Sequence, residues 1–167
     1  KCGKLILVIK MKFKKTNAMR KLEQLKIDYE SINYDPEEEF DANKAYQYLD
    51  DKTIPICKTI VLEQGTDHFV VVIPLDAHIS MKKAAQAFGV KKVALLHLKE
   101  LLTLTGYVRG GCSPIGMKKL FPTILDTSAL DYEKILVSGG RRGSHIIVNP
   151  QDLADSVNAS FHDVLEV

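Results

Sequence analysis

A glycine-rich segment bordered by cationic side chains is the part of this sequence best suited to chemistry. Residues 105–119 read TGYVRGGCSPIGMKK. The glycine pair at 110–111 permits positive φ and leaves backbone N–H groups uncovered, and Pro114 stiffens the exit of the loop. A loop of this kind can wrap a small group. A tight connection between two elements is the alternative, and the flanking cations favour the binding role: Arg109, Lys118 and Lys119.

The same segment lacks the residues of several common catalytic sites. It does not contain GxxxxGK[ST], so it is not a nucleotide-binding P-loop. Cys112 has no histidine close to it in the sequence that would generate a thiolate, and we interpret it as a packing or pocket-lining residue. The three cysteines, Cys2, Cys57 and Cys112, are widely spaced without a CxxC. This argues against a disulfide framework or a zinc site, and we expect no metal and no cofactor.

Composition indicates one globular domain. The chain has 167 residues, of which 46% are hydrophobic and 26% charged, which is enough for a real core. The formal net charge is only +2, so a polyanion would have to be met by a local basic patch. No apolar run approaches the ~18 residues of a membrane span, and the cysteine usage suits a reducing, cytoplasmic compartment. We interpret residues 1–10 as an extension or tag and residues 11–167 as the domain.

Strands and helices alternate irregularly in the sequence. The firmest prediction is a hairpin, residues 56–62 and 68–73, joined by EQGTD. Helices are predicted after the capping residues Thr16 and Ser80, the second ending at Gly89, and again at 41–49, 95–104 and from Asn149-Pro150 to 157. Further strands are predicted at 29–34, 122–125, 135–138 and 145–148, with a tight turn at 139–143 and a solvated acidic loop at 37–39. This order favours an α+β fold.

Several blocks of the sequence together resemble a known family. GYVRGGCSPIGMKK followed by FPTILD, with ICKTIVLE upstream and VSGGRRG downstream, is similar to the YbaK type of prolyl-tRNA editing domain. The resemblance extends from about Thr16 to the C-terminus. It implies a mixed, barrel-like β-sheet flanked by helices. It also implies a freestanding deacylase that clears mischarged aminoacyl-tRNA, chiefly Cys-tRNA(Pro).

The resemblance assigns catalytic positions. Lys58 aligns with the lysine that the family needs for activity, and a lysine inside an apolar strand pattern is costly unless its ammonium meets an anion or a carbonyl. A lysine that reaches the surface from a strand edge is the alternative. The GxxxP motif of the family falls on Gly110–Pro114. Its amides, chiefly those of Gly111 and Ser113, would stabilise the charge that develops on the ester carbonyl oxygen.

The resemblance further implies that the substrate supplies the nucleophile: the thiol of the misattached cysteine attacks its own ester and leaves as a cyclic thiolactone. Tyr34 could equally be a core aromatic, and His145 stands where relatives carry an acidic residue. The positions expected to bind the substrate are Tyr34, Thr59, Gly110, Cys112, Pro114 and His145.

The tRNA would be held through phosphate contacts that weaken as salt rises. Prolyl-tRNA synthetase is a further expected partner, and no membrane is. Two alternatives stay open: a catalytically silent module that binds tRNA or a synthetase, and a deacylase of Ala-tRNA, Ser-tRNA or a small aminoacyl metabolite. The cations expected to contact tRNA are Lys118, Lys119, Arg141 and Arg142, together with Lys82, Lys83, Lys91 and Lys92.

Overall fold

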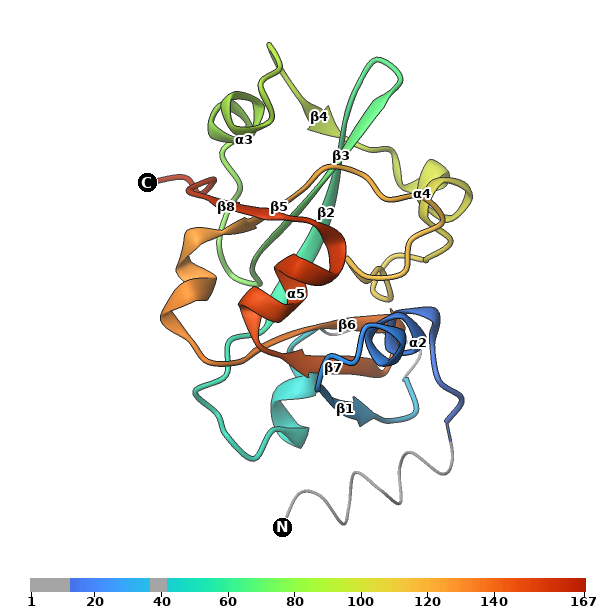
Figure 1. Cartoon of the computed structure of the whole chain (residues 1–167). Helices are drawn as coiled ribbons and strands as arrows, with labels where there is room; N and C mark the ends of the chain where they lie inside the picture. Colours follow the sequence, from blue (N-terminus) through green and yellow to red (C-terminus); the bar gives the residue numbers. More distant parts are fainter. Residues whose placement is uncertain (1–12, 37–41) are drawn as a thin grey trace.

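The computed structural model describes residues 13–36 and 42–167, which form two β-sheets with helices packed around them (Figure 1). The predicted extension at 1–10 and the predicted acidic loop at 37–39 lie outside the described residues. The α+β prediction is confirmed. The expected single barrel-like sheet is instead divided into a three-stranded and a five-stranded sheet, so a closed barrel is not confirmed.

The smaller sheet is antiparallel throughout and has the strand order β1-β7-β6. Its strands are β1 (Glu30–Asn33), β6 (Ile135–Arg141) and β7 (Ser144–Val148). The turn predicted at 139–143 is shorter than expected, because β6 continues through both glycines to Arg141 with a register shift between Ser138 and Arg141. A bulge of this kind bends the strand and increases its twist.

The larger sheet has the strand order β4-β2-β3-β5-β8. The predicted hairpin is confirmed as β2 (Cys57–Gln64) and β3 (Asp67–Pro74), with Gly65 in its turn at φ +60°. The strands β5 (Thr123–Asp126) and β8 (Ser160–His162) add to it in parallel, and the two-residue β4 (Ala94–Leu95) pairs with β2 at Leu62 and Glu63.

Side-chain caps define most helix starts. Thr16 accepts from the N–H of Met19 at α2 (Asn17–Gln24), Ser80 from Lys83 at α3 (Met81–Phe88), and Asn149 from Asp152 at α5 (Pro150–Val157), as predicted. The predicted helix at 95–104 is α4 (Leu98–Thr105), which starts three residues later because β4 occupies Leu95. The described part of the chain also contains two 3₁₀ helices, η1 (Ala42–Tyr48) and η2 (Thr127–Asp131).

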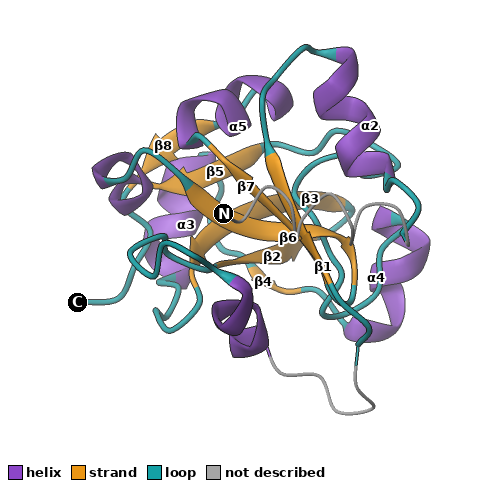
Figure 2. Ribbon diagram, turned by 90° about the horizontal axis from the view of Figure 1, so that it is seen from below, coloured by secondary structure: helices purple, strands orange, loops and turns teal. Residues whose placement is uncertain are grey.

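The two sheets meet over a shared core. Figure 2 shows the helices on the outside of the strands. The largest cluster of buried side chains joins α2 and α5 to β6 and β7 on one side and to β2, β3 and β5 on the other, with Leu22, Leu125, Ile135 and Leu153 fully buried. Burying each such side chain contributes about 1.5–3 kcal/mol. This core fixes the position of β2 relative to β6, and the site described next lies along that junction.

Candidate active site

The N-terminal end of β2 joins the two sheets. Ile56 bridges to Leu136 of β6, and the N–H of Leu136 donates to the carbonyl of Pro55 at 3.0 Å. β4 pairs with β2 only at Leu62 and Glu63, near the C-terminal end of β2. The N-terminal half of the same edge has no β4 partner, and Lys58 and Thr59 lie in this half.

The glycine-rich segment folds back on itself after α4. The hydroxyl of Tyr107 donates to the carbonyl of Ile115 at 2.6 Å, which joins the two ends of the loop. Inside the loop, the N–H of Gly111 donates to the carbonyl of Val108 at 2.9 Å, and the N–H of Ile115 donates to Oγ of Ser113 at 3.2 Å. Ser113 is completely buried. The loop is therefore held in one shape by its own polar groups.

Gly111 brings this loop against the β6–β7 turn. A Cβ atom at Gly111 would lie 2.7 Å from Cα of Arg141, closer than real side chains come to backbone. Nε of Arg142 also donates to the carbonyl of Arg109 at 2.9 Å. Only glycine permits so close an approach, so the two glycine–arginine segments of the sequence form one neighbourhood.

A cavity of about 200 Å³ lies where these elements converge. Five residues predicted for the site line it together: Lys58, Thr59, Gly110, Cys112 and His145. The remaining wall comes from residues that the sequence did not single out: Ile56, Cys57, Leu75, Leu136 and Ser138. The cavity is thus a mainly apolar hollow with one cation and a few polar groups, and its size suits a small chemical group.

Two polar groups of β2 have no partner among the residues that the structure describes. Oγ1 of Thr59 is buried and makes no hydrogen bond with them, and Lys58 takes part in neither an ion pair nor a hydrogen bond. A buried hydroxyl without a partner costs about 1–3 kcal/mol. The pattern is that of a site whose polar groups are completed by a ligand.

His145 is buried and uncharged at neutral pH. It lies on β7 opposite Ser138 of β6, and burial lowers the pKa of its imidazole to about 4. Its Nε2 and the hydroxyl of Tyr34 share a hydrogen bond of 2.8 Å, and the rings of Tyr34 and Tyr48 stack at 4.6 Å. Tyr34 therefore reaches the cavity wall through His145, although it does not line the cavity itself.

The cysteines of the wall are poor nucleophiles. Burial raises the pKa of the Cys112 thiol to about 11 and that of Cys57 to about 12. Both are therefore protonated at neutral pH, and the interpretation of Cys112 as a pocket-lining residue agrees with its position. Among the described residues there is also no group of three or more His, Cys, Asp or Glu side chains placed to hold a metal ion.

The other predicted positions do not line the cavity. Gly111, Ser113 and Pro114 are buried within the loop and do not line it. Lys118 and Lys119 border a different groove of about 560 Å³, where Nζ of Lys119 lies 5.9 Å from the centre of the Phe121 ring. Arg141 and Arg142 lie beside the glycine loop, as described above.

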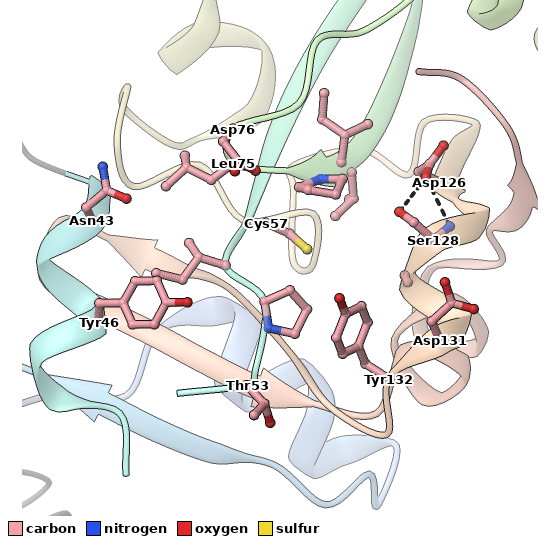
Figure 3. Close-up of a pocket in the computed structure, with 16 residues that line it drawn as sticks. Asn43, Tyr46, Thr53, Cys57, Leu75, Asp76, Asp126, Ser128, Asp131 and Tyr132 are labelled. Atoms are coloured by element: carbon pink, nitrogen blue, oxygen red, sulfur yellow. Dashed lines mark hydrogen bonds between the residues drawn. The ribbon is translucent and has the colours of Figure 1, made fainter. Parts of the chain in front are cut away.

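A second cavity, of about 320 Å³, lies next to the first and shares Ile56, Cys57 and Leu75 with it (Figure 3). Figure 3 shows Tyr46 and Tyr132 on its wall and the sulfur of Cys57 directed into it. Asp126 belongs to this cavity but accepts from the N–H groups of Ser128 and Val164, so it caps a turn. Its oxygens are used within the fold.

Comparison with known proteins identifies the family. The family model of the aminoacyl-tRNA editing domain matches residues 36–156, which includes every residue of the smaller cavity. The chain belongs to this family. No helix among the described residues is long and apolar enough to cross a membrane.

Relatives cover nearly the whole editing domain. EbsC of Enterococcus faecalis, a candidate deacylase of Cys-tRNA(Pro) and Cys-tRNA(Cys), is 43% identical over 152 residues, which is 90% of this chain and 93% of EbsC. The prolyl-tRNA editing protein ProX of Acetoanaerobium sticklandii is 24% identical over 156 residues, covering 92% and 89% of the two chains. A solved structure of a candidate trans-editing enzyme for prolyl-tRNA synthetase superposes with a TM-score of 0.78 at 21% identity, covering 90% and 96%.

Proposed function

We propose that this protein is a trans-editing aminoacyl-tRNA deacylase that clears mischarged Cys-tRNA(Pro) in the cytoplasm. The observation that carries the proposal is the shared cavity: Lys58 and the glycine loop, which are 52 positions apart in the sequence, form one hollow of about 200 Å³. Together with membership of the editing family, this supports a site for the aminoacyl ester at the end of tRNA.

The size and lining of the cavity suit a small amino-acid side chain. Its apolar wall, from Ile56, Leu75 and Leu136, accommodates an apolar or sulfur-containing group, and the hydroxyl of Thr59 can bond the ester or the ribose. Lys58 brings the positive charge that the developing oxyanion or the terminal nucleotide requires. We assign Lys58 the catalytic role and Thr59, Gly110, Cys112 and His145 the role of substrate contacts, with Tyr34 positioning His145.

The glycine loop would act through its backbone. The N–H of Gly111 is already bonded to Val108, so we assign Gly111 the role of admitting the close contact with Arg141. Among the described residues no hydrogen-bond partner is found for the N–H of Cys112, which lines the cavity, or for that of Ser113. These two N–H groups are the candidates for stabilising the oxyanion, and Pro114 keeps the loop in shape.

No serine, cysteine or carboxylate of the cavity wall is set up as a nucleophile, and the substrate thiol can serve instead. In this step the substrate sulfur bonds to the carbonyl carbon and the bond from that carbon to the ribose oxygen breaks. The thiol proton ends on the released ribose hydroxyl, and the amino acid leaves as a thiolactone. The protein fixes the geometry of an intramolecular attack, which is a large source of rate.

The tRNA backbone would lie across four cations, Arg141 and Arg142 beside the glycine loop and Lys118 and Lys119 at the separate groove. With a formal net charge of +2, binding should be weak and should fall with rising salt. Delivery by prolyl-tRNA synthetase would compensate for weak binding.

The deciding experiment measures deacylation of Cys-tRNA(Pro), Ala-tRNA(Pro) and Ser-tRNA(Pro) by purified protein. Cys-tRNA(Pro) should be cleaved fastest, since serine lacks the thiol. Lys58→Ala should abolish cleavage, Cys112→Ala should keep most of it, and Lys21→Ala, an exposed lysine on α2, is the matched control. Equal rates on the cysteinyl and seryl substrates would exclude the thiol-assisted step. No cleavage of any of them would leave a binding module as the function.

A further inference from the structure

Three arginines lie on the two chain segments that adjoin the candidate active site, although none of them lines the cavity. Arg109 precedes the cavity residue Gly110, and Arg141 and Arg142 end β6 and begin its turn to β7. The hydrogen bond from Nε of Arg142 to the carbonyl of Arg109 and the backbone contact at Gly111 hold the two loops together. Three guanidinium groups are thus carried by backbone that adjoins the cavity.

Arg141 is held at a cost to the fold. Its Nη2 is buried without a hydrogen-bond partner, and its guanidinium lies 5.7 Å from the centre of the Phe13 ring. Burial also lowers the pKa of the side chain. A buried donor of a charged group without a hydrogen-bond partner destabilises the folded state. The residue as a whole remains partly exposed, so part of the side chain is accessible from outside.

Neither Arg109 nor Arg141 forms an ion pair with another of the described residues. The wall of the cavity itself contains no acidic side chain. Arg109 and Arg141 therefore carry positive charge that no carboxylate of the described residues pairs with, and Arg141 is partly desolvated. This combination attracts an anion more strongly than separate surface lysines do.

We propose that Arg141, supported by Arg109, binds the 5′-phosphate of the terminal nucleoside of the acylated RNA. The inference rests on the proposed function, which places the ester of that same nucleoside in the cavity. The phosphate and the ester are carried by one ribose, so an ester bound beside Gly110 brings the phosphate close to the adjoining arginines. The planar fork of a guanidinium donates two hydrogen bonds to phosphate oxygens and so fixes orientation as well as charge.

This site differs from general attraction of the tRNA backbone. Lys118 and Lys119 are exposed and border a separate groove, where they can contact phosphates of the tRNA backbone without distinguishing among them. Arg141 instead binds one phosphate, which lies at a fixed distance from the reacting carbonyl. It is a binding residue that turns the ester toward Lys58 and the loop amides.

The test uses ligands that cannot react, so that its result does not depend on deacylation. Adenosine 5′-monophosphate and adenosine are titrated into the ¹⁵N-labelled full chain, and dissociation constants are taken from amide chemical shifts. The wild type should bind the monophosphate about 10-fold more tightly than adenosine, the gain expected of one charge-assisted hydrogen-bonded pair. The shifts should include the amides of Gly110 and Gly111.

Arg141→Gln should reduce this preference to about 2-fold or less, since a neutral amide replaces the charged fork. Lys21→Gln, at an exposed position of α2, should leave the preference at the wild-type value. Arg109→Gln, on the exposed loop, should lower the preference for the monophosphate in part. If the amide spectrum of Arg141→Gln shows that this variant does not fold, Arg109→Gln provides the test. Any of three results would overturn the inference. The wild type could bind both ligands equally, both arginine variants could keep the wild-type preference, or the shifts could be confined to the groove of Lys118 and Lys119. Failure to cleave Cys-tRNA(Pro) would overturn the proposed function and not this result.

Discussion

Replacing Gly111 by alanine should separate the glycine loop from the β6–β7 turn. The new Cβ would lie 2.7 Å from Cα of Arg141, 2.9 Å from its carbonyl carbon and 3.0 Å from the backbone nitrogen of Arg142. All three are backbone atoms, which cannot rotate aside as a flexible side chain can. Gly111 does not have a positive φ, so the effect is steric and does not come from backbone strain.

The size of the effect follows from this overlap. Forcing an extra methyl group into a packed position costs about 1–3 kcal/mol. For a chain of this size each kcal/mol lowers Tm by about 2–4 °C, so Tm should fall by roughly 2–12 °C. The neighbouring residues Gly110 and Cys112 line the cavity, and their displacement by about 1 Å should reduce deacylation by ~100-fold.

Two measurements on Gly111→Ala check the prediction: thermal unfolding followed by circular dichroism, and initial rates on Cys-tRNA(Pro) well below the Tm of the variant. The matched control is Gly65→Ala in the β2–β3 turn, where φ is +60° and no atom lies within 4 Å of the added Cβ. There the left-handed backbone alone should cost about 1–2 kcal/mol, with the rate unchanged. A Gly111→Ala protein with wild-type Tm and rate, or a control that loses activity equally, would refute the reasoning.

Two further predictions concern the cavity wall. Thr59→Val removes a buried hydroxyl that has no hydrogen-bond partner within 13–36 and 42–167, so the free energy of unfolding should stay equal or rise by up to about 1 kcal/mol. Deacylation should fall by ~10-fold or more, and a wild-type rate would exclude a role for the hydroxyl. Burial lowers the pKa of His145 from its ordinary 6.5 to about 4, so at acid pH the unfolded chain binds more protons than the folded chain. The stability that this group contributes is therefore complete above pH 6.5 and is lost as the pH falls toward 4. The free energy of unfolding, measured with denaturant, should therefore fall by about 1.5 kcal/mol between pH 6.5 and pH 5, and this fall should be absent in His145→Gln. The same dependence of this free energy on pH in both proteins would contradict the burial of a neutral imidazole.

The elements predicted correctly are those fixed by local chemistry. Thr16, Ser80 and Asn149 cap helices because their side chains reach an N–H three residues ahead, and Gly89 ends α3 in the left-handed region, which a glycine favours. The β2–β3 hairpin likewise forms between neighbours in the chain. The strands β4 and β8 were missed, since two or three residues carry no usable periodicity and β8 pairs with β5, more than thirty positions earlier.

The site was predictable only in part. The resemblance located Lys58, the glycine loop and His145, but not the apolar wall, because Ile56, Leu75 and Leu136 look like ordinary core residues in the sequence. Ser138 gave no signal either, since a single serine at a strand position is common. Their convergence comes from the junction of the two sheets, which depends on contacts between distant segments. The internal bond of the Gly111 N–H could likewise be seen only in three dimensions.

The parallel pairing of β5 with β8 has a consequence for synthesis of the protein. β5 ends at Asp126, and its partner strand begins at Ser160, with Val164 donating back to the carboxylate of Asp126. A nascent chain that has reached residue 150 already contains Lys58, the glycine loop and His145, yet one edge of β5 is still bare. That edge can recruit a strand from another molecule in the meantime. Residues 160–164 take no part in the proposed chemistry, yet they must be synthesised before the sheet that supports the site is complete.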